Sequence, residues 1–262
     1  MGMQAVSGTL TFRGSAMIEN AQLISLSRQM ALQRQMDVVA NNMANINTTG
    51  FKGEQILFEE YVMPVARDQD FPRLDQPLSY VQDWATIHDL TGGAVVQTGS
   101  ELDVALNGEG FFAVQTPAGE RWTKAGAFQL SANGTLVDAS GNPVLGNGGP
   151  IQFGPEENGI LIGADGSVSS SAGLKGRLRV VEFDNPQQLT REGSNLWAGG
   201  TPVAATTTRV MQGFIEKSNV SGVSEMAEMI RVTRAYESAA NLAQKQDELR
   251  RNAIQRLGDT NA

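Results

Sequence analysis

Residues 18–45 read IENAQLISLSRQMALQRQMDVVANNMAN and contain neither Gly nor Pro. Apolar side chains recur there at steps of three and four residues, in one row that starts at Ile18 and a second that starts at Leu23. This spacing predicts an α-helix of about 28 residues, about 42 Å long. Because its apolar surface is wider than one seam and carries few charges, the helix needs more than one neighbour.

A second long helix is predicted at the other end of the chain, from near Val223 to near Leu257. Asn219 and Ser221 are both suited to cap its first turn, and Gly258 is suited to end it. Two interpretations of the helices stay open. They form an antiparallel or coiled-coil-like unit, or each packs separately on a sheet.

The region between the helices is rich in Gly, Asn, Thr and Pro and has short apolar runs typical of strands. Asn133-Gly134 and Asp165-Gly166 stand between such runs and predict two hairpins. Residues 176–183 predict a further strand. We therefore predict a mainly β protein with two long terminal α-helices. Its central domain is an antiparallel barrel or sandwich, and its terminal segments form a coiled-coil-like helical assembly domain.

Five segments are expected along the chain. Residues 1–16 show no helical face, and we expect a disordered or non-native extension there. The expected segments are 1–16 (extension), 17–52 (first helix and turn), 53–80 (connecting segment), 81–211 (β-rich central domain) and 212–262 (second helix).

The composition argues against several function classes. The 262 residues include 28 acidic and 20 basic side chains, and the net charge of -8 disfavours a nucleic-acid partner. Without Cys there is no disulfide and no thiolate metal site, and the single histidine, His88, cannot form a multi-histidine site. No apolar run approaches the roughly 20 residues of a membrane span. We expect no cofactor, no metal and no membrane-spanning segment.

No catalytic motif is found. The glycine-rich stretches 108–112 and 146–150 lack the ending of a P-loop, and we interpret them as hairpin residues. Carboxylates are numerous enough for a glycosidase pair, but no motif marks one. His88 lies in a strand-like stretch and is interpreted as a structural histidine. The sequence favours a non-enzymatic protein, with a cell-wall hydrolase and a binding module as alternatives.

Three stretches resemble the bacterial flagellar rod and hook proteins. Residues 40–52, ANNMANINTTGFK, are similar to the N-terminal signature of that family. Residues 102–138, which begin LDVALNGEGFFAVQTPAG, are similar to its central β segment, and residues 212–239, which begin QGFIEKSNVSGVSEM, to its C-terminal signature. The three matches occur in order and cover most of residues 17–257.

The resemblance implies a structural subunit of the basal-body rod. The size and the single central β region are more similar to the rod members than to the longer hook protein. Among these the proximal-rod member is favoured, with the distal-rod member as the alternative. The rod is a drive shaft that transmits torque through the periplasm, and the flagellar type III apparatus exports its subunits without a cleavable signal peptide. The implied partners are other rod proteins, copies of this chain and the export apparatus.

The residues expected to matter serve assembly, and none is expected to be catalytic. Those expected to set the turn after the first helix are Asn41, Asn42, Asn45, Asn47, Gly50 and Phe51. Those expected to set the entry to the second helix are Ser218, Asn219 and Val220. Those expected to pack or pair on the second helix are Met226, Met229, Ile230, Thr233, Arg234, Tyr236 and Glu237. Ordinary packing or capping within the chain is the alternative for each.

Helices with apolar surface on several sides are not satisfied within one chain. A head-to-tail contact that does not close generates a filament, and burial of the helices would stabilise it by roughly 25 cal/mol per Å² of apolar area. We expect the free subunit to hold its helices loosely and to order them on assembly. Gly50→Val is expected to block incorporation into a polymer more than it lowers the melting temperature of the β domain.

Overall fold

The computed structural model describes residues 9–62, 79–193 and 195–259. The chain divides into two compact units. The first comprises Met1–Asn41, Gln55–Ile87 and Val223–Ala262, and the second comprises Asn42–Glu54 and His88–Gly222. The fold is mainly β with two long helices near the ends of the chain, as predicted.

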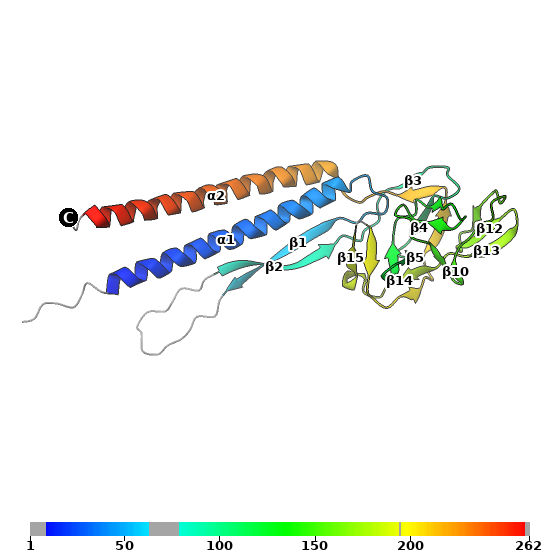
Figure 1. The fold of residues 1–262 in the computed structure, drawn as a ribbon, viewed down its shortest axis with the longest axis horizontal. Helices are drawn as coiled ribbons and strands as arrows, with labels where there is room; N and C mark the ends of the chain where they lie inside the picture. The colour runs from blue at the N-terminus through cyan, green and yellow to red at the C-terminus, as the bar shows by residue number, and fades with distance from the viewer. Residues whose placement is uncertain (1–8, 63–78, 194, 260–262) are drawn as a thin grey trace, which may run out of the picture. The chain divides into compact units, whose positions relative to one another are not determined.

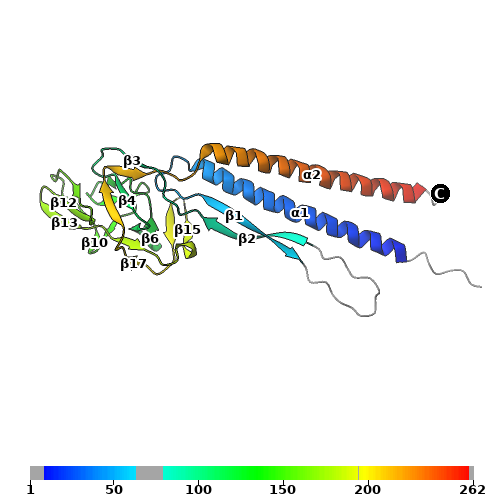
Figure 2. The same cartoon turned by 180° about the vertical axis from the view of Figure 1, so that it is seen from behind.

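The first unit contains most of both helices and a two-stranded sheet. Its elements are α1 Thr9–Ala44, α2 Gly222–Asp259, β1 Glu54–Val62 and β2 Ser79–His88, and β1 pairs with β2. The two helices run side by side (Figures 1 and 2). The Gln35 side-chain amide donates a hydrogen bond to Glu228 at 2.7 Å, and the Thr233 hydroxyl lies 3.8 Å from the Met36 sulfur.

The first helix begins earlier than predicted, at Thr9 rather than near Ile18. The part of the predicted extension that the structure describes, residues 9–16, is therefore helical; residues 1–8 lie outside the described residues. The stretch contains no Pro, and its one glycine, Gly14, costs a helix only about 1 kcal/mol relative to Ala. A single glycine is too weak a signal to end a helix of this length.

Within the predicted connecting segment 53–80, β1 and β2 occupy most of the described residues. The sequence of β1, EQILFEEYV, is rich in β-branched and aromatic residues, which favour strands. The prolines of this segment, Pro64, Pro72 and Pro77, lie in residues 63–78, outside the described residues.

The second unit is built from short strands and one 3-10 turn. They are β3 Val95–Gln97, β4 Val104–Asn107, β5 Phe111–Thr116, β6 Gly119–Thr123, β7 Gln129–Leu130, β8 Leu136–Val137, β9 Leu145–Gly146, β10 Gly149–Pro150, β11 Leu161–Ile162, β12 Ser167–Ser170, β13 Gly173–Arg177, β14 Val180–Glu182, η1 Pro186–Gln188, β15 Thr190–Glu192, β16 Leu196–Ala198, β17 Val203–Ala204, β18 Arg209–Gln212 and β19 Phe214–Glu216.

The predicted barrel does not form among the strands that the structure describes. The largest sheet has the order β15-β16-β6-β5-β14-β17 and is open, with β15 and β17 at its edges. A second sheet has the order β11-β12-β13, and the other strands pair as β4–β18, β3–β19, β7–β8 and β9–β10. Many strands are only two or three residues long, too short to continue a ladder around a closed barrel.

The core of the second unit lies on both faces of its largest sheet. Successive side chains of a strand point to opposite faces, and β5 is buried on both. Phe112 and Val114 belong to one hydrophobic cluster, whereas Phe111 and Ala113 belong to another that contains Trp197. The two clusters hold the unit together.

Both predicted hairpins are confirmed. Leu130 pairs with Leu136 across the Asn133-Gly134 turn, where Gly134 has a φ of +74°. Ile162 pairs with Val168 across the Asp165-Gly166 turn. The strand predicted over residues 176–183 is divided into β13 and β14, because the backbone between them bonds to other segments.

Candidate functional site

Three segments join the helices and the β1–β2 pair to the second unit: residues 42–54, 88–93 and 216–222, called the junction below. All of them belong to the second unit. The turn after α1 is held by Asn45, whose side-chain oxygen accepts a hydrogen bond from the Thr48 hydroxyl at 3.0 Å. Asn41 and Asn47, also predicted to set this turn, are exposed.

Gly50 is the most tightly constrained residue of this turn. Its φ is +67°, a conformation that side chains with a Cβ rarely adopt. A Cβ there would stand 2.5 Å from the amide nitrogen of Ala125 and overlap the backbone of Lys124. The Gly50 N–H donates to the carbonyl of Glu216 at 2.7 Å, so the turn also bonds to the strand that leads toward α2. Only glycine fits this position.

Asn42 closes the junction on the side of β1. Its side chain is buried, its amide donates to the Glu54 carbonyl at 2.9 Å, and its oxygen accepts from the Glu54 N–H at 3.0 Å. One side chain thus satisfies both backbone groups of Glu54, which fixes where β1 starts after the turn.

We expect Asn42→Ala to lower the free energy of unfolding by roughly 1–3 kcal/mol, because it leaves two partly buried backbone groups of Glu54 without their partner. Urea titration of the purified chain measures this loss. Asn47→Ala, at an exposed turn position, is the control and should change stability by less than about 0.5 kcal/mol. Equal losses for the two variants would contradict the role given to Asn42.

Asn219, one of the two residues expected to cap α2, bonds to two other segments instead, which leaves Ser221 as the candidate cap. Its side-chain oxygen accepts from the Gly53 N–H at 2.8 Å, and its amide donates to the Asp89 carbonyl at 2.8 Å. Ser218 accepts a hydrogen bond from the Val220 N–H at 3.2 Å. The entry to α2 is therefore bonded to the segments that flank β1 and β2.

A buried ion pair that the sequence did not predict ties the junction together. Lys52 is fully buried, and its Nζ lies 2.5 Å from Glu216 Oε1 and 2.7 Å from the Thr91 carbonyl. Glu216 is also buried and accepts a hydrogen bond from the Gly93 N–H at 2.9 Å. Lys52 follows α1 and Glu216 precedes α2. One ion pair therefore links the segment after α1 and the segment before α2 to each other, and both also bond to the segment after β2.

A second group of side chains that the sequence did not predict surrounds Phe51, which is fully buried. The guanidinium of Arg191 lies 4.3 Å from the centre of the Phe51 ring and 5.0 Å from that of Trp197. Arg191 Nη1 lies 3.2 Å from Glu54 Oε1, and His88 Nδ1 lies 3.4 Å from the same oxygen. His88 and Arg191 hold the pKa of the Glu54 carboxyl below its ordinary value.

The α2 side chains that were expected to serve assembly fall into an exposed group and a half-buried group. Met226 and Ile230 are 58% and 49% exposed. Those that are half-buried are Met229, Thr233 and Tyr236. Arg234 and Glu237 lie in the part of the chain that the structure describes. Both are exposed, and no ion pair joins them. They line a groove of about 520 Å³ on α2 instead.

Three family models match this chain, and each covers part of it. Residues 23–52 match "Flagella basal body rod protein", residues 105–170 match "Flagellar hook protein FlgE/F/G D1 domain", and residues 211–256 match "Flagellar basal body rod FlgEFG protein C-terminal". The flagellar basal-body rod protein FlgF of Caulobacter vibrioides is 39% identical over 248 residues, which span 93% of this chain and 100% of that protein.

This chain belongs to the flagellar basal-body rod protein family. FlgF of Mesorhizobium japonicum is 35% identical over 92% of this chain and 99% of its own length. The flagellar basal-body rod protein FlgG of Bacillus subtilis is 32% identical over 86% of this chain and 94% of its own length. The chain is thus a structural subunit of the flagellar rod, more similar to these FlgF proteins than to this FlgG protein.

The rod-family matches include both sides of the junction. The N-terminal match ends at Lys52, and the C-terminal match includes Glu216 and Asn219. The buried pair of Lys52 and Glu216 therefore joins two segments that separate rod-family models describe.

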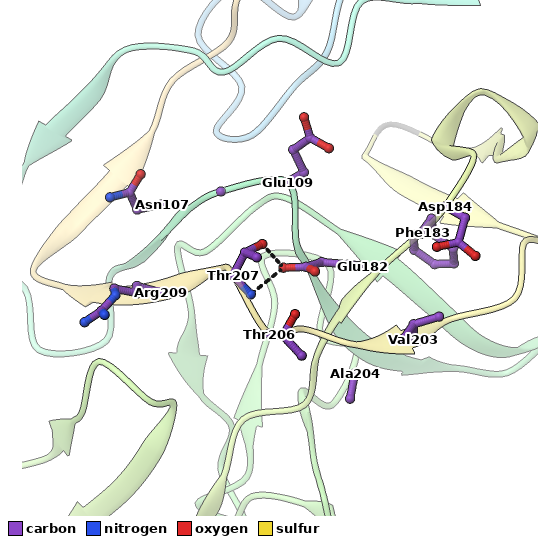
Figure 3. Close-up of a pocket in the computed structure, with 11 residues that line it drawn as sticks. Asn107, Glu109, Glu182, Phe183, Asp184, Val203, Ala204, Thr206, Thr207 and Arg209 are labelled. Carbon is purple, nitrogen blue, oxygen red and sulfur yellow. Dashed lines mark hydrogen bonds between the residues drawn. The ribbon is translucent and has the colours of Figure 1, made fainter.

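The described residues of this rod subunit contain no group of three or more His, Asp or Glu side chains placed to hold a metal ion. None of their helices combines the length and apolar character needed to cross a membrane. A depression of about 710 Å³ lies beside β14 and β17 (Figure 3).

One carboxylate in the lining of the depression accepts several hydrogen bonds. Glu182 Oε1 accepts hydrogen bonds from the hydroxyls of Thr207 and Thr208 at 2.9 and 2.6 Å, and from their N–H groups at 3.3 and 3.0 Å. The Thr207 bonds are drawn in Figure 3. These bonds, with that from the Thr208 hydroxyl the strongest, lower the pKa of Glu182 from 4.5 to about 2.

A lowered carboxyl pKa makes stability depend on pH. Because the pKa of Glu182 is lower in the folded state, its contribution is fully present above about pH 4.5 and is lost as the pH falls toward 2. We expect Glu182→Gln to flatten the loss of stability over that range, measured by thermal melting at several pH values. Glu156→Gln, at an exposed loop position, is the control and should follow the unmodified chain. An unchanged acid profile for Glu182→Gln would contradict this account.

Proposed function

We propose that this rod subunit polymerises through α1 and α2, with coiled-coil-like packing against copies of itself and other rod proteins. We place it in the proximal, periplasmic part of the rod, where it transmits torque as a non-catalytic protein. In this proposal the flagellar type III apparatus exports it without a cleavable signal peptide. The resemblance to the rod family supports the location, and the exposed apolar side chains of the helices support the mode of assembly.

The helices present apolar side chains to solvent at regular spacing. Leu26 and Met30 on α1 are four residues apart and are 53% and 63% exposed, so they lie on one face. Val223, Met226 and Ile230 on α2 are 83%, 58% and 49% exposed at steps of three and four residues. Full burial of an exposed side chain of this size is worth about 1.5–3 kcal/mol, and each of these side chains gains its exposed share of that when a neighbour covers it.

The junction supports the same proposal. Asn42, Gly50 and Asn219 bond the segments 42–54, 88–93 and 216–222 to one another within the second unit. The end of the turn after α1 and the entry to α2 are therefore held together in every subunit.

Ile230→Glu tests the proposal because it places a charge on the exposed face of α2. We expect the variant to be nearly absent from isolated basal bodies and its cells to be non-motile. The melting temperature of the purified chain should stay within about 2 °C of the unmodified one, as a surface substitution changes stability little. Ser224→Glu is the matched control, since it adds the same charge at an exposed position of the first turns and should assemble normally.

Normal incorporation of Ile230→Glu would contradict assembly through this face. Two other outcomes would contradict the structural role. One is release of fragments from purified peptidoglycan by the purified chain, which would favour a cell-wall hydrolase. The other is a stoichiometric soluble complex with an export or ring component and no incorporation into the rod, which would favour a binding module.

A further inference from the structure

The second unit contains four Asn-Gly pairs, a sequence that can modify itself without an enzyme. The backbone nitrogen of the glycine attacks the side-chain carbonyl carbon of the asparagine, and the bond from that carbon to the amide nitrogen breaks. The glycine N–H proton leaves with the amide nitrogen as ammonia, and a cyclic succinimide remains. Water opens the ring to aspartate or isoaspartate. The pairs are Asn107-Gly108, Asn133-Gly134, Asn147-Gly148 and Asn158-Gly159.

The fold decides which of these pairs can react. The attack requires a glycine N–H that donates to no other group and an asparagine side chain that can turn back over its own backbone, because an intramolecular reaction depends on the approach of the reacting atoms. All four asparagines are exposed, so exposure alone does not separate them. Their hydrogen bonds do.

Two of the pairs are held by the sheets and the turns around them. The Gly134 N–H donates to the carbonyl of Ser131 at 2.9 Å, which occupies the attacking nitrogen. Asn107 is the last residue of β4 and is paired with Arg209 of β18. Both pairs are therefore restrained.

Gly108, which follows Asn107, is fixed as well. Its carbonyl accepts a hydrogen bond from the Lys124 ammonium at 2.9 Å. A Cβ on Gly108 would stand 2.8 Å from the Thr208 hydroxyl oxygen, so this part of the backbone lies against Thr208 with little room to move.

Asn158 is held through its backbone and its side chain. Its N–H donates to the Ser171 hydroxyl at 3.2 Å, and its carbonyl accepts from the Ser171 N–H at 3.0 Å. Its side-chain amide donates to the Glu156 carbonyl at 3.3 Å. The side chain must give up this last bond before it can turn toward Gly159.

Asn147-Gly148 lacks these restraints. The two residues form the turn between β9 and β10, where Gly146 pairs with Gly149. The Asn147 N–H donates to the Arg177 carbonyl at 2.9 Å, but no hydrogen bond to another described residue holds the Asn147 side chain or the Gly148 N–H. A Cβ on Gly148 would meet nothing within 4 Å.

The strands on either side of this turn are short. β9 and β10 have two residues each, so few ladder bonds oppose a local change of the turn. The attacking nitrogen, the side chain and the space around them are thus all available at Asn147-Gly148.

We propose that Asn147 is a modification site, at which the folded chain converts itself through a succinimide to aspartate or isoaspartate faster than at its other Asn-Gly pairs. The conversion adds one negative charge to a chain of net charge -8. Isoaspartate also lengthens the backbone of the β9–β10 turn by one methylene group. Because water does not restore the amide, the converted fraction increases with the age of the chain.

Peptide mapping by mass spectrometry tests the proposal. The purified full chain is incubated in a mildly alkaline buffer, once folded and once in concentrated urea, and the conversion of each Asn-Gly pair is followed with time. In the folded chain we expect Asn147 to convert several times faster than Asn107, Asn133 and Asn158. In urea the four rates should converge, because the hydrogen bonds that separate them are lost.

Gly148→Ala is the matched variant. Its Cβ enters open space, and Gly148 is not among the glycines with a positive φ, so the melting temperature should stay within about 2 °C of that of the unmodified chain. The new Cβ crowds the attacking nitrogen, and we expect the conversion of Asn147 to slow severalfold while the other three rates stay unchanged.

Two results would overturn the inference. One is a folded chain in which Asn147 converts no faster than the other three asparagines. The other is the same order and spacing of the four rates in urea, which would show that the sequence around each pair, and not the fold, selects the site. Neither result bears on the proposed assembly through the helices.

Discussion

We expect Gly50→Ala to lower the free energy of unfolding of the β-rich unit by roughly 2–5 kcal/mol. About 1–2 kcal/mol comes from the positive φ of +67°, and about 1–3 kcal/mol from forcing a Cβ into the backbone of Lys124 and Ala125. Urea unfolding followed by tryptophan fluorescence measures the loss, since Trp122 and Trp197 are both buried in this unit.

Gly141→Ala is the matched control for Gly50→Ala. Gly141 also has a positive φ, +84°, but a Cβ there would meet nothing within 4 Å. Only the conformational cost of about 1–2 kcal/mol applies to it. Equal losses at the two positions would mean that the contact with Lys124 and Ala125 does not matter.

The position of Gly50 also revises an expectation drawn from the sequence. Gly50→Val was expected to impair polymer incorporation more than the melting of the β domain. Because Gly50 contacts the backbone of that domain, we now expect the domain to melt at a lower temperature as well.

Glu216→Gln is expected to cost about 3–5 kcal/mol of unfolding free energy. The change leaves the fully buried ammonium group of Lys52 without its charged partner, which is far more costly than the loss of a surface pair. The same equilibrium unfolding experiment measures it. The double variant Lys52→Met with Glu216→Met should recover much of the loss, because it removes both charges and keeps the space filled.

A surface pair supplies the comparison for Glu216→Gln. Arg121 and Glu192 form a two-point ion pair in which the Glu192 side chain is 48% exposed. Glu192→Gln should cost at most about 1 kcal/mol. A small loss for Glu216→Gln, or a double variant less stable than either single variant, would contradict the role assigned to the buried pair.

Local patterns explain which parts of the fold were predictable. The helices follow from apolar residues at steps of three and four, and the hairpins follow from Asn133-Gly134 and Asp165-Gly166. The start of α1 at Thr9 differs from the prediction because residues 9–16 show no apolar row at helical spacing, and the helix continues through them without that signal. Of the two predicted alternatives, barrel or sandwich, the closed barrel does not form, because sheet closure depends on pairing between distant segments that single strands do not encode.

The candidate site was predicted only where the chain turns. Gly50, Asn42 and Asn219 are residue types that turns require, and their neighbourhoods were recognisable. Lys52 and Glu216 are 164 positions apart, and a single lysine or glutamate in a sequence normally indicates solvent exposure. Arg191 gave no local signal either, because its partners Phe51 and Trp197 are brought to it by the fold.

The central claim is that the apolar faces of α1 and α2 are completed by neighbouring subunits. Amide hydrogen exchange of the purified, unassembled chain tests it most directly, because exchange reports how firmly each helix is held. We predict fast exchange over residues 20–45 and 225–255 together with slow exchange in the strands β5 and β6. Full protection of both helices in the free chain would contradict the claim.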